Sequence, residues 1–175
     1  MKGSLRAMAA SGALALLSCG FGFAESLGGA APDFERPDLA GNQIHLAAFR
    51  GKVVLLNFWA SWCAPCLKEM PRFSAWQRDY GVEGLQILGV SMDDDAAPVR
   101  RLLAKRPQAY PILMGDAKLG EAFGGVLGLP CSYLIDTEGR IVARFRGDSD
   151  LKQIEVQIKA LLPGLHGPRR PVSVN

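Results

Sequence analysis

The stretch of the chain that decides its fold is VVLLNFWASWCAPC, residues 53–66. Its first half is an apolar run broken only by Asn57, without the alternation of a half-buried strand. Such a run predicts a strand covered on both faces, as at the centre of a parallel sheet.

Cys63 and Cys66 follow this strand, and a buried strand leading into a Cys-x-x-Cys turn and a helix is typical of a redox motif. Residues three apart on a helix lie about 5–6 Å apart on one face, within the Cα separation of about 4.4–6.8 Å that a disulfide needs. We therefore expect the two sulfurs to form and break a bond with little backbone movement.

Strands and helices alternate on both sides of this stretch. After an extended lead-in, the patterns predict a hairpin at 38–46, strands at 53–59, 85–90, 110–114, 132–135 and 141–145, and helices at 64–80, 99–105, 118–123 and 151–162. This order predicts a layered α/β domain, with a central mixed sheet flanked by helices and an N-terminal β-hairpin extension. We expect the domain to span residues 25–163 and residues 164–175 to form a flexible tail.

The first 24 residues have the pattern of an export signal. Lys2 and Arg6 precede an apolar stretch, and a small-x-small sequence ending at Ala24 resembles a cleavage site. Two alternatives stay open: an uncleaved membrane anchor, or a lipoprotein box in which Cys19 is lipidated. All three place the domain in the periplasm or cell envelope, where disulfides persist.

Composition narrows the class of protein. A chain of 175 residues with 49% hydrophobic residues is sufficient for one domain with a core. The net charge is +3, and two of the positive charges lie in the export segment. The near-neutral remainder argues against nucleic-acid binding. With four cysteines, one of them in the export segment, and with His45 and His166 as the only histidines, the sequence does not supply a four-ligand zinc site.

Two blocks of sequence resemble the thioredoxin superfamily, and more finely the TlpA/ResA-like extracytoplasmic thiol–disulfide oxidoreductases. The first block is residues 51–66 followed by Glu69-Met70-Pro71, and the second is residues 128–136 followed by Gly139. The resemblance covers roughly residues 31–162 and implies a thioredoxin-like fold.

The cysteine pair and one acid are the predicted catalytic residues. Cys63 would sit at a helix N-terminus, which favours a thiolate nucleophile, and Cys66 would resolve the mixed disulfide. Glu69, one turn beyond Cys66, is predicted to exchange a proton with the buried thiol, and the resemblance implies the same role. The alternative is a solvated glutamate. Asn57 stands where ordinary thioredoxins carry a buried aspartate, which leaves Glu69 as the acid in place.

The resemblance implies that the second block, residues 128–136, binds the protein substrate. Leu129-Pro130 resembles the cis-proline loop that faces the cysteine pair, where the residue before proline pairs with an extended partner segment. With Trp62 and Pro65, these residues form the predicted substrate-binding set. Cys131 follows directly, where many relatives carry threonine. Three interpretations stay open for it: a third redox thiol, a metal ligand with the pair, or a small buried residue.

The resemblance implies a protein reductant without a bound cofactor or metal, because the cysteine pair carries both electrons. It would act as a monomer and receive electrons from a membrane thiol transporter of the DsbD/CcdA kind. Its substrates would be apocytochrome c cysteines or a copper-site protein. The alternatives are a disulfide oxidase or isomerase, and a copper-binding chaperone using Cys63, Cys66 and Cys131. A peroxidase requires a threonine- and proline-framed cysteine, which the sequence lacks.

Overall fold

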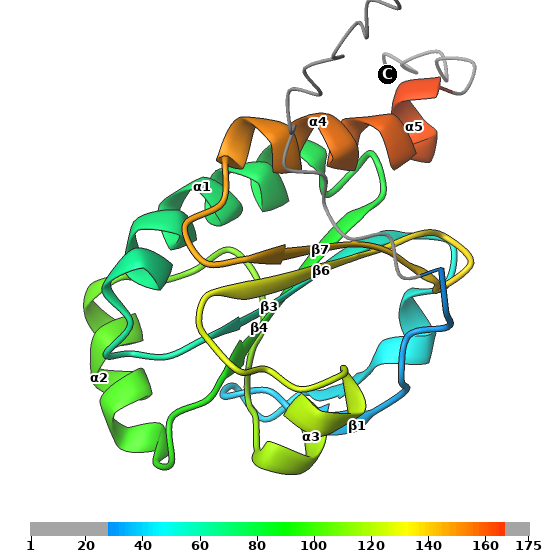
Figure 1. The fold of residues 1–175 in the computed structure, drawn as a ribbon. Coiled ribbons are helices and arrows are strands. Elements are labelled where there is room, and N and C mark those ends of the chain that lie inside the picture. The colour runs from blue at the N-terminus through cyan, green and yellow to red at the C-terminus, as the bar shows by residue number, and fades with distance from the viewer. Residues whose placement is uncertain (1–27, 167–175) are drawn as a thin grey trace, which may run out of the picture.

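A five-stranded mixed sheet forms the centre of the protein (Figure 1). The computed structural model describes residues 28–166; residues 1–27, which include the predicted export segment and Cys19, and residues 167–175 lie outside them. The strands run in the order β5-β4-β3-β6-β7. Their bounds are Val53–Trp59 for β3, Leu85–Ser91 for β4, Ile112–Met114 for β5, Cys131–Ile135 for β6 and Ile141–Arg146 for β7. β3, β4 and β5 are mutually parallel, whereas β6 and β7 are antiparallel to their neighbours. The predicted mixed sheet is confirmed.

A small hairpin precedes the sheet. It comprises β1 (Glu35–Pro37) and β2 (Gln43–His45), and the short 3-10 helix η1 (Leu46–Phe49) follows it. The expected position, residues 38–46, is wrong for the first strand, which lies within the expected lead-in. The reason is Asp38, whose carboxylate accepts hydrogen bonds from the N–H groups of Ala40 and Asn42 at 2.9 and 2.8 Å and so forms the turn itself.

Five α-helices lie within residues 28–166. They are α1 (Ala64–Tyr80), α2 (Ala96–Lys105), α3 (Ala117–Ala122), α4 (Leu151–Leu161) and α5 (Pro163–His166). α2 begins three residues earlier than expected because Asp95 caps it, accepting from the Ala97 N–H at 2.9 Å. α5 occupies the expected start of the tail, where the Gly164 N–H donates to the Glu83 carbonyl at 3.2 Å. Within residues 28–166, no helix is long and apolar enough to cross a membrane.

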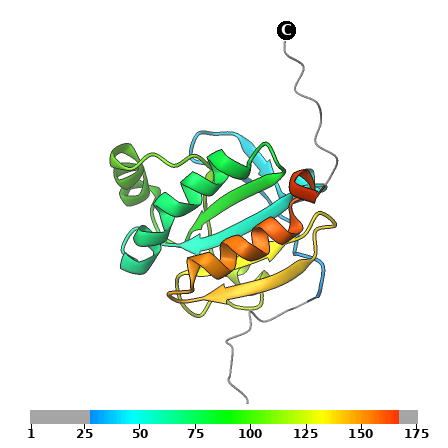
Figure 2. The ribbon, with the colours of Figure 1, turned by 90° about the horizontal axis from the view of Figure 1, so that it is seen from above.

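The sheet separates two hydrophobic cores. All of β3 is buried, as predicted, and its side chains alternate between the two faces. α1 and α4 lie side by side over one face, joined by an Arg72–Glu155 ion pair of 2.6 Å (Figures 1 and 2). The α1-side core includes Leu55, Trp59, Cys63, Cys66, Phe73, Leu134 and Ile158. The α3-side core includes Phe34, Leu56, Phe58, Phe123, Cys131 and Tyr133.

Candidate active site

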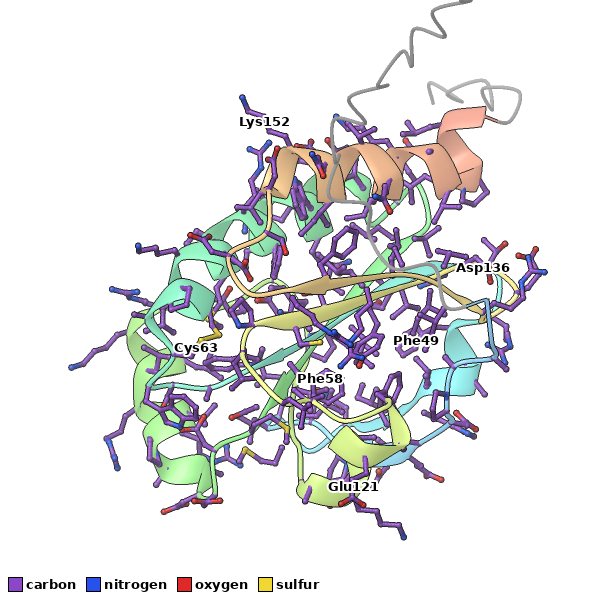
Figure 3. The ribbon with its side chains drawn as sticks, viewed as in Figure 1. Phe49, Phe58, Cys63, Glu121, Asp136 and Lys152 are labelled. Carbon is purple, nitrogen blue, oxygen red and sulfur yellow. A yellow bond between two sulfur atoms is a disulfide. The ribbon has the colours of Figure 1, made fainter. Side chains whose placement is uncertain are left out.

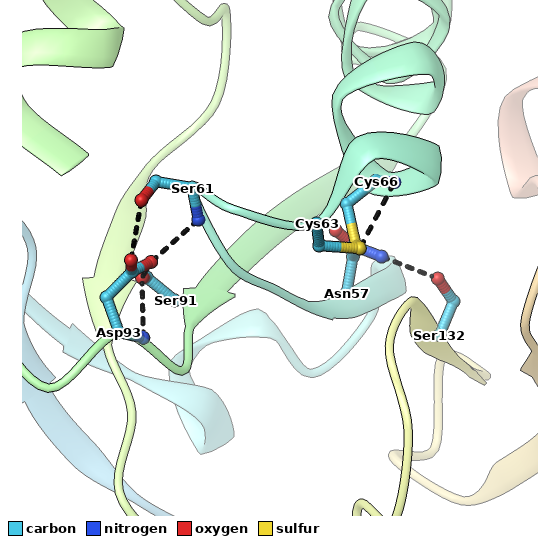
Figure 4. The surroundings of a disulfide bond; sticks show 7 residues. All are labelled: Asn57, Ser61, Cys63, Cys66, Ser91, Asp93 and Ser132. Atoms are coloured by element: carbon cyan, nitrogen blue, oxygen red, sulfur yellow. Dashed lines mark hydrogen bonds between the residues drawn. A yellow bond between two sulfur atoms is a disulfide. The ribbon is translucent and has the colours of Figure 1, made fainter. Parts of the chain in front are cut away.

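A disulfide joins Cys63 and Cys66 where β3 gives way to α1 (Figures 3 and 4). The two Cα atoms are 5.3 Å apart. Cys63 is the N-cap of α1, and its Sγ accepts a hydrogen bond from the Cys66 N–H at 3.3 Å. Pro65 fits the first turn of the helix because no intrahelical bond is needed from its nitrogen. Cys63 is 5% exposed and Cys66 is 1% exposed, so Cys63 is the more accessible residue of the pair.

Asp93 fixes the loop that leads into the disulfide (Figure 4). Its carboxylate accepts from the Ser61 N–H at 2.8 Å and the Ser61 hydroxyl at 2.6 Å, and from the Ser91 hydroxyl at 2.7 Å. Of the three consecutive acids at 93–95, only Asp95 caps α2. The pairing of Trp59 with Ser91 explains the contact, because parallel β3 and β4 deliver their following residues to the same edge of the sheet.

A neutral pair lies behind the disulfide. Asn57 and Ser132 are opposite each other on β3 and β6, and the Asn57 amide donates to the Ser132 hydroxyl at 2.9 Å (Figure 4). Both residues are buried. The position where thioredoxins carry an acid therefore holds an uncharged, hydrogen-bonded amide.

Glu69 is buried on α1, with only 4% of the residue exposed. Burial, and then the negative charge of Asp148, raise the pKa of its carboxyl from 4.5 to about 7. Its carboxyl makes no hydrogen bond or ion pair with another residue in the described range 28–166. The alternative of a solvated glutamate is therefore wrong, and the carboxyl can hold or release a proton near neutral pH.

Two neighbours of Glu69 were missed by the sequence reasoning. Asp148 follows β7, and its charge reaches Glu69. Tyr110 is buried in the α1-side core; its burial, and then the charge of Glu69, raise its pKa. The Tyr110 hydroxyl has no hydrogen-bond partner within the described part of the chain. No periodicity in the sequence places these residues beside α1.

The Leu129–Pro130 peptide bond is cis, as expected. Leu129 packs against the core that contains Cys63 and Cys66. Its N–H and C=O make no hydrogen bond to any of residues 28–166, whereas the Pro130 carbonyl accepts from the Gly147 N–H at 2.9 Å. Trp62, immediately before the nucleophile, is 71% exposed. The structure thus sets free backbone groups and an exposed aromatic ring near the disulfide.

Cys131 has its side chain on the other face of the sheet. Cys131 pairs with Phe58 in the β3–β6 register. It is 1% exposed and packs in the α3-side core, and the Phe58 side chain points toward the same core (Figure 3). It is a free thiol, and the Arg144 Nε donates to its Sγ at 3.5 Å. Among residues 28–166, no three His, Cys, Asp or Glu side chains form a group that could hold a metal ion. The interpretation of Cys131 as a metal ligand together with Cys63 and Cys66 is therefore not supported by the described residues.

The mixed sheet, the disulfide at the N-terminus of α1 and the cis-proline loop define a thioredoxin-like thiol–disulfide oxidoreductase. The chain belongs to the AhpC/TSA family, whose model matches residues 27–144. The resemblance read from residues 51–66 and 128–136 is thereby confirmed.

Individual relatives agree with this class. The chain is 34% identical over 139 residues to the thiol-disulfide oxidoreductase ResA of Bacillus thuringiensis subsp. konkukian, covering 78% of this chain and 79% of the relative. It is 29% identical over 176 residues to ResA of Bacillus subtilis, and the match covers 94% of this chain and 98% of the relative. The crystal structure of a thiol:disulfide interchange protein of the thioredoxin family from Chlorobium tepidum TLS superposes with a TM-score of 0.72. It is 26% identical and is matched over 79% of this chain and 99% of that one.

Proposed function

We propose that this protein is an extracytoplasmic reductant that passes two electrons from the Cys63–Cys66 dithiol to disulfides in other proteins. The observation that carries the proposal is the placement of the pair: Cys63 is the more accessible residue, Cys66 is more deeply buried, and a buried, protonatable Glu69 lies one turn further along α1. The names of the relatives support the exchange chemistry, and the export pattern of the first 24 residues supports the location.

The first step is attack by the Cys63 thiolate on a substrate disulfide. The N-terminus of α1 and the Cys66 N–H stabilise the negative charge on Cys63 Sγ. A bond forms between Cys63 and one substrate sulfur, and the second substrate sulfur leaves as a thiolate that takes up a proton.

The second step releases the substrate. The Cys66 thiol must first lose its proton, and because it is buried, no bulk water is available beside it. Glu69 accepts that proton, since its pKa of about 7 makes both of its protonation states accessible. The Cys66 thiolate then attacks Cys63 Sγ, the Cys63–Cys66 disulfide forms, and the remaining substrate sulfur leaves and is protonated. Two electrons and two protons have moved to the substrate.

The substrate is held beside the cis-proline loop. The N–H and C=O of Leu129 are available to pair with an extended segment, so the partner is bound by strand addition. Trp62 and Pro65, which flank Cys63 in the sequence, supply apolar contacts, and Pro130 shapes the loop. Backbone pairing is independent of sequence, which suits a protein that reduces cysteines in unfolded chains.

The family resemblance supplies the physiological setting. The substrates are apocytochrome c cysteines or a copper-site protein, and a membrane thiol transporter of the DsbD/CcdA kind returns the electrons. The protein works as a monomer in the periplasm or cell envelope, released by cleavage after Ala24, or held by an anchor or a lipid on Cys19.

Two matched variants test the proposal in an insulin-reduction assay with dithiothreitol as the electron source. Cys63→Ser is expected to abolish reduction, because the attacking sulfur is lost. Cys66→Ser is expected to accumulate mixed disulfides with partner proteins that non-reducing gels resolve, because the resolving sulfur is lost. Retained turnover in Cys63→Ser, or no trapped species in Cys66→Ser, would contradict the assigned roles.

A further inference from the structure

A cavity of about 190 Å³ lies behind the cis-proline loop. Its lining includes Leu129, Cys131 at the start of β6, and Arg144 and Arg146 near the end of β7. Leu129 also packs against the core that holds the disulfide. The cavity and the disulfide therefore lie on two sides of the same short loop, and neither step of the exchange reaction uses the cavity.

Arg144 places a buried positive charge at the cavity. The residue is only 8% exposed, and its guanidinium donates to the Gly125 carbonyl at 2.6 Å and to Cys131 Sγ at 3.5 Å. It also lies 5.0 Å from the centre of the Tyr133 ring. Within residues 28–166, no carboxylate forms an ion pair with it. A buried charge is costly unless an opposite charge compensates it, and neutral acceptors and a ring face offset only part of that cost.

A second arginine lines the same cavity. Arg144 and Arg146 are two apart on β7, so their side chains leave the same face of the strand. Cys131 and Tyr133 lie opposite them on β6. The Arg144 guanidinium, whose donors form a fork, is suited to bidentate binding of a carboxylate, and Arg146 adds positive charge to the lining. The cavity is smaller than the sites of about 300–1,000 Å³ that hold drug-sized ligands, and this size fits one acidic side chain.

We propose that this cavity binds an aspartate or glutamate side chain of the partner polypeptide, close in sequence to its reactive cysteine. The inference rests on the proposed function. A segment paired with the free backbone groups of Leu129 passes the mouth of the cavity, and its side chains alternate between the two sides at about 3.3 Å per residue. Leu127, fully exposed in the same loop, offers an apolar contact beside it. The protein thus favours disulfides with an acid a few residues from the cysteine.

A peptide series tests this selectivity. Each peptide has blocked ends and one cysteine carried as a mixed disulfide with cysteamine, which has no carboxylate. Paired peptides place glutamate or glutamine at each position within four residues of the cysteine. Stopped-flow tryptophan fluorescence follows the reaction with the reduced protein. At one or two positions we expect the glutamate peptide to react about tenfold faster than its glutamine partner. Arg144→Gln is expected to bring that ratio close to one, whereas Arg101→Gln, on the exposed face of α2, keeps it.

A second variant tests the inference independently, in case Arg144→Gln does not fold. Gly128 lines the cavity and has no atom within 4 Å of an added Cβ, so Gly128→Glu supplies a carboxylate from the chain itself and is also expected to abolish the preference. Equal rates for every glutamate and glutamine pair would overturn the inference and leave the proposed function intact. A preference that persists in both variants would overturn it as well. Failure of the wild type to react with any peptide would instead contradict the proposed function.

Discussion

Replacing Glu69 with glutamine is expected to remove a pH dependence from the stability of the oxidised protein. Burial raises the pKa of this carboxyl from 4.5 to about 7 in the folded state. Between these two values the unfolded chain loses the proton while the folded protein retains it. The folded state then binds more protons, so the free energy of unfolding falls as the pH rises from 4.5 to about 7 and is level above that.

The size of the effect follows from the shift. A pKa that moves from 4.5 to about 7 corresponds to at most about 3 kcal/mol, at 1.36 kcal/mol for each pKa unit. Solvent screening reduces this, and we expect about 1–2 kcal/mol. Glutamine has nearly the same shape and does not ionise. Glu69→Gln should therefore gain about 1–2 kcal/mol relative to the wild type between pH 4.5 and pH 7.5.

Urea unfolding followed by circular dichroism at several pH values measures this difference. The oxidised protein is used so that Cys63 and Cys66 do not titrate. Glu121→Gln, an exposed glutamate on α3 (Figure 3), is the matched control and should keep a constant difference from the wild type. The same Glu69 variant should lose the inflection near pH 7 in the rate of thiol exchange. A Glu69→Gln stability curve parallel to that of the wild type would refute the reasoning.

Two further predictions concern groups that hold the site and the helices. Asp93→Ala leaves the Ser61 N–H and the serine hydroxyls without their acceptor, and should lower the free energy of unfolding by about 2–4 kcal/mol in denaturant titration; a loss below about 1 kcal/mol would contradict the role of Asp93. The Tyr80 hydroxyl, then Arg72 and Lys159, lower the pKa of Glu155 to about 2. The ionised Glu155 therefore stabilises the folded protein above pH 4.5, and this contribution is lost as the pH falls toward 2. Glu155→Gln should therefore destabilise the neutral protein by up to about 1 kcal/mol and flatten its acid unfolding curve, and an unchanged acid curve would count against this network.

Local signals were sufficient for the centre of the fold. The apolar run of β3, broken only by Asn57, and the Cys-x-x-Cys motif predicted a strand covered on both faces, a helix from Ala64 to Tyr80 and a disulfide at the start of that helix. These features depend on short-range propensity and spacing. The burial of Glu69 could also be predicted, because its spacing from Cys66 places both residues on the same face of α1.

Contacts between distant segments were not predictable in the same way. Asp93 meets Ser61 only because of the β3–β4 register, and Asp148 reaches Glu69 only because β7 ends beside α1. The side of the sheet that Cys131 occupies depends on strand alternation after Pro130. Since every residue of β6 is buried, its hydrophobicity carries no alternation to reveal this. Arg144 gave no signal either, because an arginine in a strand is normally expected at the surface.

The measurement that tests the central claim most directly is the reduction potential of the Cys63–Cys66 pair. The protein is equilibrated in redox buffers of graded potential, and the oxidised fraction is read from tryptophan fluorescence and confirmed by thiol alkylation. A reductant is expected to have a value near that of thioredoxin, about −270 mV, with electrons flowing to the substrate. A value near −120 mV would contradict the account and identify the protein as a disulfide oxidase.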